Sequence, residues 1–130
     1  MNKELWRQNW LDAINGLTSL ELQKNNHVKM NDYASYRSFD DYVNFYFGEL
    51  LGGFNYDFYV EEMNWITQEE YETVKNWHYE LEYGLFSNFE YSNIEEILND
   101  ATWYSILQDG ILVKQKLISI IPEAGKKYLT

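Results

Sequence analysis

The 130-residue sequence predicts an all-α fold, an irregular bundle of about five or six helices in a single domain over residues 1–130. Apolar side chains recur every three or four positions along most of the chain, which is the period of a helix that buries one face. Residues that favour helix ends separate these periodic runs. Because 45% of the residues are hydrophobic, a chain of this length can bury one core.

The N-terminal segment predicts a helix followed by a shorter one. Trp6, Trp10 and Leu17 lie on one face of the first helix. Asn15 and Gly16 are expected to end it, because both tolerate the left-handed conformation found at helix ends.

A capping box is the expected start of the second helix. Thr18 and Glu21 have the required spacing, and the helix is expected to reach about Lys24. Residues 25–37 show neither a helical nor a strand period, which predicts a connecting loop.

Residues 38–51 predict an amphipathic helix with acids in its first turn and an end at Gly52-Gly53. Its apolar face consists of Phe39, Tyr42, Val43, Tyr46, Phe47, Leu50 and Leu51. Residues 54–66 fit both an alternating and a helical pattern. A lone strand would have no partner, so we expect this segment to be irregular or helical.

A capping box formed by Thr67 and Glu70 predicts a helix that extends to about Tyr83 and ends at Gly84. Its inner face is expected to contain Tyr71, Val74, His78 and Leu81, with Trp77 beside them.

Two helices are expected in the C-terminal part of the chain. Asn93 can cap a short helix, and Asp100 can cap a long one that Pro122 stops. Gly110 lies on the apolar stripe of the long helix, where we expect it to let another backbone approach closely.

Negative charge and aromatic residues occur in the same part of the sequence. Residues 31–100 carry a net charge of −14 and hold 19 of the 24 aromatic residues, whereas residues 1–30 and 101–130 carry +1 and +2. This charge repels phosphate backbones and anionic lipid and attracts cationic partners. We therefore expect a basic protein partner and no binding to nucleic acid or membrane.

The motifs of common enzymes are absent from the sequence. It has no cysteine, Gly-rich phosphate loop, nucleophile elbow, His-Glu-x-x-His pair or calcium-loop spacing. We therefore expect no catalysis, cofactor or metal. Because the chain has neither a secretory signal nor an apolar run of about 20 residues, we expect a cytoplasmic protein.

His78 and Glu82, one helical turn apart, form the strongest candidate acid–base pair. The alternative is that His78 is a half-buried residue of the apolar stripe that bonds to a neighbour. His27 lies in the predicted loop and is expected to be exposed.

Acids and rings outside the core stripes predict a surface for a partner. Few Lys or Arg residues accompany the acids of this region, so the ion pairs that usually stabilise an exposed helix are missing. Phe45, Phe58, Tyr79 and Tyr83 also lie off the best apolar stripes. We expect one concentrated anionic face, with charge contacts and two tyrosine anchors at Asp57, Glu61, Glu62, Glu69, Glu70, Glu72, Tyr56 and Tyr59.

The order of four motifs resembles that of small immunity proteins from bacterial polymorphic and contact-dependent growth-inhibition toxin systems. The motifs are "RQNWLDAINGLTSLE", "SFDDYVNFYFGELL", "ITQEEYETVKNWHYELEYG" and "ILNDATWYSILQDGILVKQKL", and the resemblance covers roughly residues 6–118. It implies a cytosolic inhibitor that binds the toxin domain of its cognate effector, often a nuclease. Two other classes remain open, a regulatory adaptor for another basic protein and a small hydrolase that uses His78 and Glu82.

Overall fold

The computed structural model describes residues 2–28, 39–88 and 93–130, and every regular element among them is helical, which confirms the all-α prediction. The elements in chain order are α1 (Lys3–Leu17), α2 (Leu20–Val28), α3 (Phe39–Asn44), the π-helices η1 (Phe45–Leu50) and η2 (Phe58–Glu62), α4 (Gln68–Tyr83), the π-helix η3 (Gly84–Asn88), α5 (Ile94–Leu98), α6 (Ala101–Ile120) and the 3₁₀ helix η4 (Glu123–Leu129).

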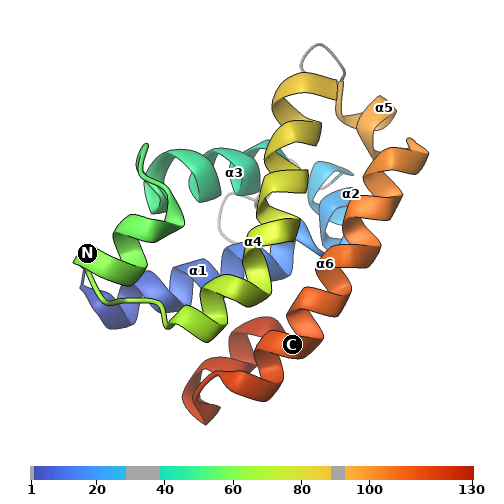
Figure 1. Cartoon of the computed structure of the whole chain (residues 1–130). Helices are drawn as coiled ribbons and strands as arrows, with labels where there is room; N and C mark the ends of the chain where they lie inside the picture. The colour runs from blue at the N-terminus through green and yellow to red at the C-terminus, as the bar shows by residue number, and fades with distance from the viewer. Residues whose placement is uncertain (1, 29–38, 89–92) are drawn as a thin grey trace.

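Helix α1 lies at the centre of the fold. It contacts α3, η1, α6 and η4, while α4 and α6 run antiparallel, side by side, in front of it (Figure 1). One hydrophobic cluster extends from Trp6 near the N-terminus to Leu129 near the C-terminus. Among the described helices, none has both the length and the apolar character needed to cross a bilayer.

The predicted stop at Asn15-Gly16 is wrong, because α1 continues to Leu17. The Asn15 side chain accepts a hydrogen bond from Lys114 Nζ at 3.1 Å. Gly16 lies against the ring of Tyr42, which fills the space where a Cβ atom would stand. The glycine therefore serves helix packing here, not helix termination.

The start and the end of the second helix differ from the prediction. Ser19 Oγ, not Thr18, accepts the capping bond, from Leu22 N at 3.1 Å. The Thr18 hydroxyl instead bonds back to the Ile14 carbonyl at 2.8 Å. Helix α2 then reaches Val28, so residues 25–28 are not part of a loop, and the rest of the predicted loop lies outside the described residues.

Residues 39–50 form one continuous helical run in which α3 passes into the π-helix η1, as the apolar stripe predicts. Gly52 and Gly53 end it with φ angles of 60° and 83°, a conformation that glycine adopts at little cost. The next segment contains η2, which confirms the prediction of an irregular or helical segment.

Capping predictions hold at α4, α5 and α6. Thr67 and Glu70 form the reciprocal capping box, with bonds of 3.1 Å and 3.0 Å. Asn93 Oδ1 accepts from Glu96 N at 2.9 Å, and Asp100 Oδ1 accepts from Thr102 N at 2.7 Å.

The two glycine predictions in this part of the fold have different outcomes. Helix α4 ends at Tyr83 with Gly84 as its C-cap, as predicted, although Gly84 keeps a helical φ of −59° and the π-helix η3 follows directly. At Gly110 the nearest neighbours are side chains and not the expected backbone. Side chains of Trp77 and Thr18 occupy the space, each 2.7 Å from the position that a Cβ atom would take.

The Gly16–Tyr42 contact predicts a large effect of adding one methyl group. Gly16→Ala should lower the free energy of unfolding by about 1–3 kcal/mol, because the Tyr42 ring must move. Urea denaturation measures this change. Gly48→Ala is the matched control, since nothing lies within 4 Å of its Cβ position, and its stability should stay within about 1 kcal/mol of the native chain. Equal effects of the two substitutions would contradict the packing role of Gly16.

Candidate functional site

Tyr56 and Tyr59 are core residues, so the prediction that they are exposed anchors is wrong. Their exposed fractions are 1% and 6%. Tyr56 accepts a hydrogen bond from Trp10 Nε1 at 2.9 Å. The Tyr59 hydroxyl lies 2.9 Å and 2.8 Å from the carbonyl oxygens of Leu50 and Leu51. Both rings are thus buried in the hydrophobic core, and both hydroxyl groups form hydrogen bonds there.

Glu70 is also not available to a partner, because its exposed fraction is 2%. Its two carboxylate oxygens accept hydrogen bonds from Arg7 Nη1 and Nη2 at 2.8 Å and 2.7 Å. Burial alone would raise the pKa of the Glu70 carboxyl, but the bonds from Arg7 and Thr67 outweigh it and lower this pKa. The carboxylate is an internal tie between α1 and the start of α4.

The other five predicted contact residues are exposed. Asp57, Glu61 and Glu62 lie in or next to η2, and Glu69 and Glu72 lie in the first half of α4. The carboxyl of Asp57 is within hydrogen-bonding reach of the Tyr71 hydroxyl on α4. Burial, followed by the neighbouring Tyr79 and Asp57, raises the pKa of Tyr71 to about 12.

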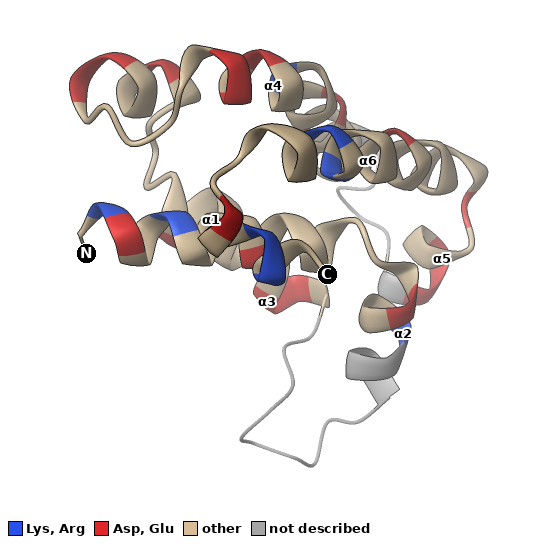
Figure 2. Ribbon diagram, turned by 90° about the horizontal axis from the view of Figure 1, so that it is seen from below, with Lys and Arg blue, Asp and Glu red and all other residues tan. Residues whose placement is uncertain are grey.

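The acids that are predicted to form a single anionic face are distributed over several helices (Figure 2). Acidic positions occur along α4, but also on α3 and α5, and α1 lies between α4 and α3 (Figure 2). The charge is concentrated in the sequence, but the helices that carry it lie in different parts of the molecule (Figure 2). The exposed acids among the predicted contact residues lie in or next to η2 and in α4.

The outward side of α4 carries exposed aromatic rings. Glu72, Asn76, Tyr79 and Tyr83 follow one another at intervals of three or four residues, which places them on one side of the helix. Tyr79 is 49% exposed, Tyr83 is 64% exposed, and Phe86 in the adjoining η3 is 51% exposed. We call these five residues the α4 outer face.

Part of this face could be predicted from the sequence. Tyr79 and Tyr83 fall off the core stripe, and the structure places both at the surface. Phe86 lies beyond the predicted end of the helix at Gly84 and is therefore absent from the predicted surface. Its spacing of three residues from Tyr83 was the available signal. Of the predicted acids, Glu72 belongs to this face and Glu69 flanks it.

His78 is buried within a chain of hydrogen bonds. The Trp10 indole donates to Tyr56, the Tyr56 and Tyr46 hydroxyls lie 2.5 Å apart, and Tyr46 Oη lies 2.9 Å from His78 Nδ1. Trp10 can only donate, so Tyr56 is the acceptor in the first bond, whereas either hydroxyl can donate in the second and the role of Nδ1 in the third depends on the tautomer of His78. Burial lowers the pKa of His78 to about 4, so the ring is neutral at pH 7.

The candidate pair of His78 and Glu82 is not formed, since no hydrogen bond joins these two residues within the described chain. The exposed fraction of His78 is only 4%, whereas Glu82 is exposed. The reading of His78 as a residue of the apolar stripe bonded to a neighbour agrees with its contact to Tyr46, although it is fully rather than half buried. The side chain of His27 lies outside the described residues.

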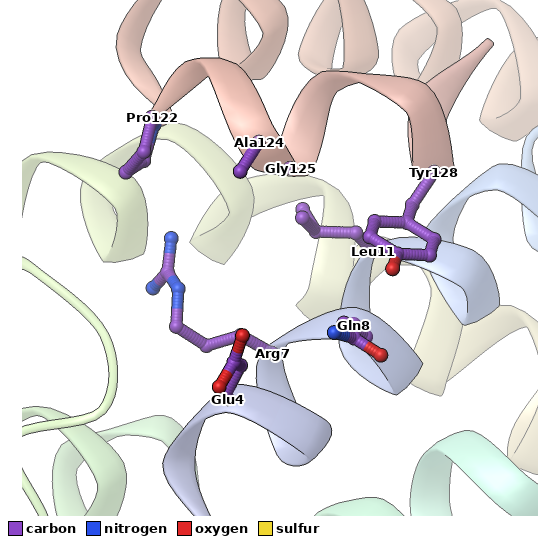
Figure 3. A pocket seen from close by; sticks show the side chains of 8 residues that line it. All are labelled: Glu4, Arg7, Gln8, Leu11, Pro122, Ala124, Gly125 and Tyr128. Carbon is purple, nitrogen blue, oxygen red and sulfur yellow. The ribbon is translucent and has the colours of Figure 1, made fainter.

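A small pocket of about 130 Å³ lies between α1 and η4 (Figure 3). Leu11, Pro122, Ala124 and the Tyr128 ring form apolar walls, with Glu4, Arg7 and Gln8 on the α1 side. The Arg7 guanidinium is already bound to Glu70 and to the Trp65 carbonyl. The residues that line this pocket provide no nucleophile with a neighbouring base.

The described residues contain no group of three or more His, Asp or Glu side chains arranged to hold a metal ion. No protein-family model matches the chain, and no curated protein and no solved structure is significantly similar to it.

The Arg7–Glu70 pair predicts a distinctive pH dependence when Arg7 is replaced. Arg7→Gln should lower the free energy of unfolding at pH 7 by about 3 kcal/mol, because it leaves a buried carboxylate unpaired. This loss should shrink as the pH falls, since burial then raises the pKa of Glu70 and the carboxyl becomes neutral. Urea denaturation at pH 7 and pH 5 measures both effects. The control is Lys3→Gln, an exposed cation on the same helix, and a similar loss in that variant would refute the assignment.

The buried, neutral His78 predicts a loss of stability in acid. Its pKa is about 4 in the folded chain and about 6.5 when unfolded, so protons favour the unfolded chain as the pH falls from 6.5 to 4. The stability advantage of the native chain over His78→Gln should therefore shrink, by up to about 3 kcal/mol, across this window. Denaturation of both proteins from pH 7.5 to pH 4 tests it.

Glu80 acts in the opposite direction, because burial and then Asp109 raise the pKa of its carboxyl to about 7. Its contribution to stability is therefore lost as the pH rises from about 4.5 to 7. Because the native chain and His78→Gln both contain Glu80, this contribution cancels when their stabilities are compared at the same pH. A constant difference between the native chain and His78→Gln would show that His78 does not titrate in this way.

Proposed function

We propose that this chain is an immunity protein that binds and neutralises the toxin domain of a cognate polymorphic or contact-dependent system in the cytoplasm, without catalysis of its own. The α4 outer face carries the proposal, because it presents three exposed rings and an acid on one side of a helix. The order of the sequence motifs supports the same class of protein.

Exposed rings on a regular helix are suited to protein recognition. Tyrosine provides a large, rigid surface with a polar end, and binding energy concentrates in such anchors once they are desolvated. Phe86 packs against Phe47 with the ring centroids 5.1 Å apart, which holds its ring in place before binding. The Phe86 ring therefore loses little conformational freedom when a partner covers it.

The charge around these rings favours a basic partner. Glu69 and Glu82 flank the face and are exposed, and neither forms an ion pair with a described residue. The neighbouring cation, Lys75, lies over the Tyr71 ring at 5.9 Å. A toxin that acts on nucleic acid needs a basic cleft, and an anionic partner with a net charge of −11 approaches such a cleft rapidly.

The direct test is co-expression of the chain with the toxin domain of its cognate effector, scored as rescue of growth. Rescue without loss of protection in His78→Gln would support inhibition by binding. A toxin domain that is neither bound nor neutralised would refute the immunity function. If the chain instead captures a different basic protein with no toxic activity, the regulatory adaptor is the correct class.

The rings of the α4 outer face should dominate the affinity. Tyr79→Ala and Tyr83→Ala should each raise the Kd for the toxin domain at least about tenfold, mainly through faster dissociation. The association rate should fall as salt is added, because exposed charges are screened. Surface plasmon resonance at several salt concentrations measures both rates.

Tyr104→Ala is the matched control for this experiment. Tyr104 is 57% exposed, but it lies on α6 about 140° around the helix from Asp109, which faces α4. Its removal should leave the Kd within about twofold of the native value. Loss of affinity in Tyr104→Ala with none in the α4 variants would place the interface elsewhere.

A further inference from the structure

A groove of about 570 Å³ separates the first half of α4 from the second half of α6. We call it the α4–α6 groove, and it is lined by Glu69, Glu72, Thr73, Leu112, Val113, Lys116, Ser119 and Ile120. Binding pockets of about 300–1,000 Å³ hold a drug-sized molecule, so this groove has room for a few side chains of a docked segment. It adjoins the α4 outer face, because Glu72 belongs to both.

The floor of the groove is apolar and is open to a partner. Leu112 is 64% exposed, as much as Tyr83, the most exposed tyrosine of the α4 outer face. Val113 and Ile120 are partly buried and pack against the core below. An exposed leucine beside two partly buried branched residues gives an apolar side chain from a partner a surface to cover.

The α4 side of the groove is anionic. Glu69 and Glu72 are exposed and form no ion pair with any described residue, including Lys116 on the opposite side. Further along the same two helices, the Glu80 and Asp109 carboxyls lie within hydrogen-bonding reach of each other. Burial and then this neighbour raise the pKa of Glu80 to about 7.

The facing sides of α4 and α6 thus carry four carboxyl groups and a single amine, Lys116. Like charges held close together cost free energy, and a cation from outside relieves that cost. The groove therefore combines apolar side chains with acids that attract positive charge.

We propose that the α4–α6 groove receives an amphipathic segment of the toxin partner, with an apolar side chain on Leu112 and Lys or Arg side chains beside Glu69 and Glu72. This inference rests on the proposed function and adds a second contact to it. The rings of the α4 outer face would bind one part of the toxin domain, and the groove would bind a neighbouring basic segment.

The test has two arms that separate the groove from the immunity function. In the first arm, a short synthetic amphipathic helix of leucine and lysine is added to the ¹⁵N-labelled full chain, with the same peptide carrying glutamate for lysine as the control. The lysine peptide should shift amide signals of residues 69–73 and 109–120, and the glutamate peptide should not.

Groove variants make this arm decisive. Leu112→Asp and Glu69→Lys should each raise the Kd of the lysine peptide at least about tenfold. Leu5→Asp on α1 and Glu95→Lys on α5 make the same changes at exposed positions outside the groove, and should bind as the native chain does. Shifts elsewhere, or equal binding by groove and control variants, would overturn the proposal. Circular dichroism of each variant verifies its fold.

In the second arm, the same variants are co-expressed with the cognate toxin domain. Leu112→Asp and Glu69→Lys should weaken growth rescue, whereas Leu5→Asp and Glu95→Lys should not. Full rescue by the groove variants would overturn the groove as a toxin contact and leave the immunity function standing. Failure of the native chain to rescue growth would overturn the immunity function itself, whatever the peptide result.

Discussion

The ion pair between Arg7 and Glu70 is the constraint on which the rest of the structure depends. The Glu70 carboxylate accepts hydrogen bonds from Nη1 and Nη2 of Arg7 and from the backbone N–H of Thr67. It therefore closes the N-terminus of α4 and fixes this helix against α1 with one buried side chain. Since Glu70 must point inward, residues on the opposite side of α4 must point outward, and these include the tyrosines of the α4 outer face.

The aromatic content of the chain divides between core and surface for a second physical reason. In the core, hydrogen bonds connect Trp10 to Tyr56, Tyr56 to Tyr46, and Tyr46 to His78, so these polar groups are buried with partners. The rings of Tyr83 and Phe86 remain largely exposed at the surface. The aromatic residues of this chain therefore fill the core and also provide exposed rings that a protein partner can contact.

Much of the fold could be predicted because helix starts are encoded locally. Asn93, Asp100 and the box of Thr67 and Glu70 all cap the helices that their spacing indicates. Predictions from the sequence fail where a tertiary contact determines the role of a residue. Gly16 looks like a helix end in the sequence but accommodates the Tyr42 ring, a contact with a residue 26 positions away that no local pattern reveals.

The candidate site was harder to predict for three reasons. Residues 54–66 fit both an alternating and a helical period, so the spacing does not predict that Tyr56 and Tyr59 point inward. Glu70 fits both a capping box and an acidic surface in the sequence, although a carboxylate that caps a helix is already engaged. The net charge of a stretch of sequence does not reveal that α3, α4 and α5, which all carry acids, lie in different parts of the molecule (Figure 2). What remains of the predicted surface is the part on η2 and α4.

Hydrogen–deuterium exchange of the chain, alone and with its cognate toxin domain, tests the central claim most directly. If the α4 outer face binds the toxin, amides of residues 69–86 should exchange more slowly in the complex, while those of α3 and α5 should not change. Protection confined to α1 and η4, around the pocket in Figure 3, with none along α4, would contradict this account.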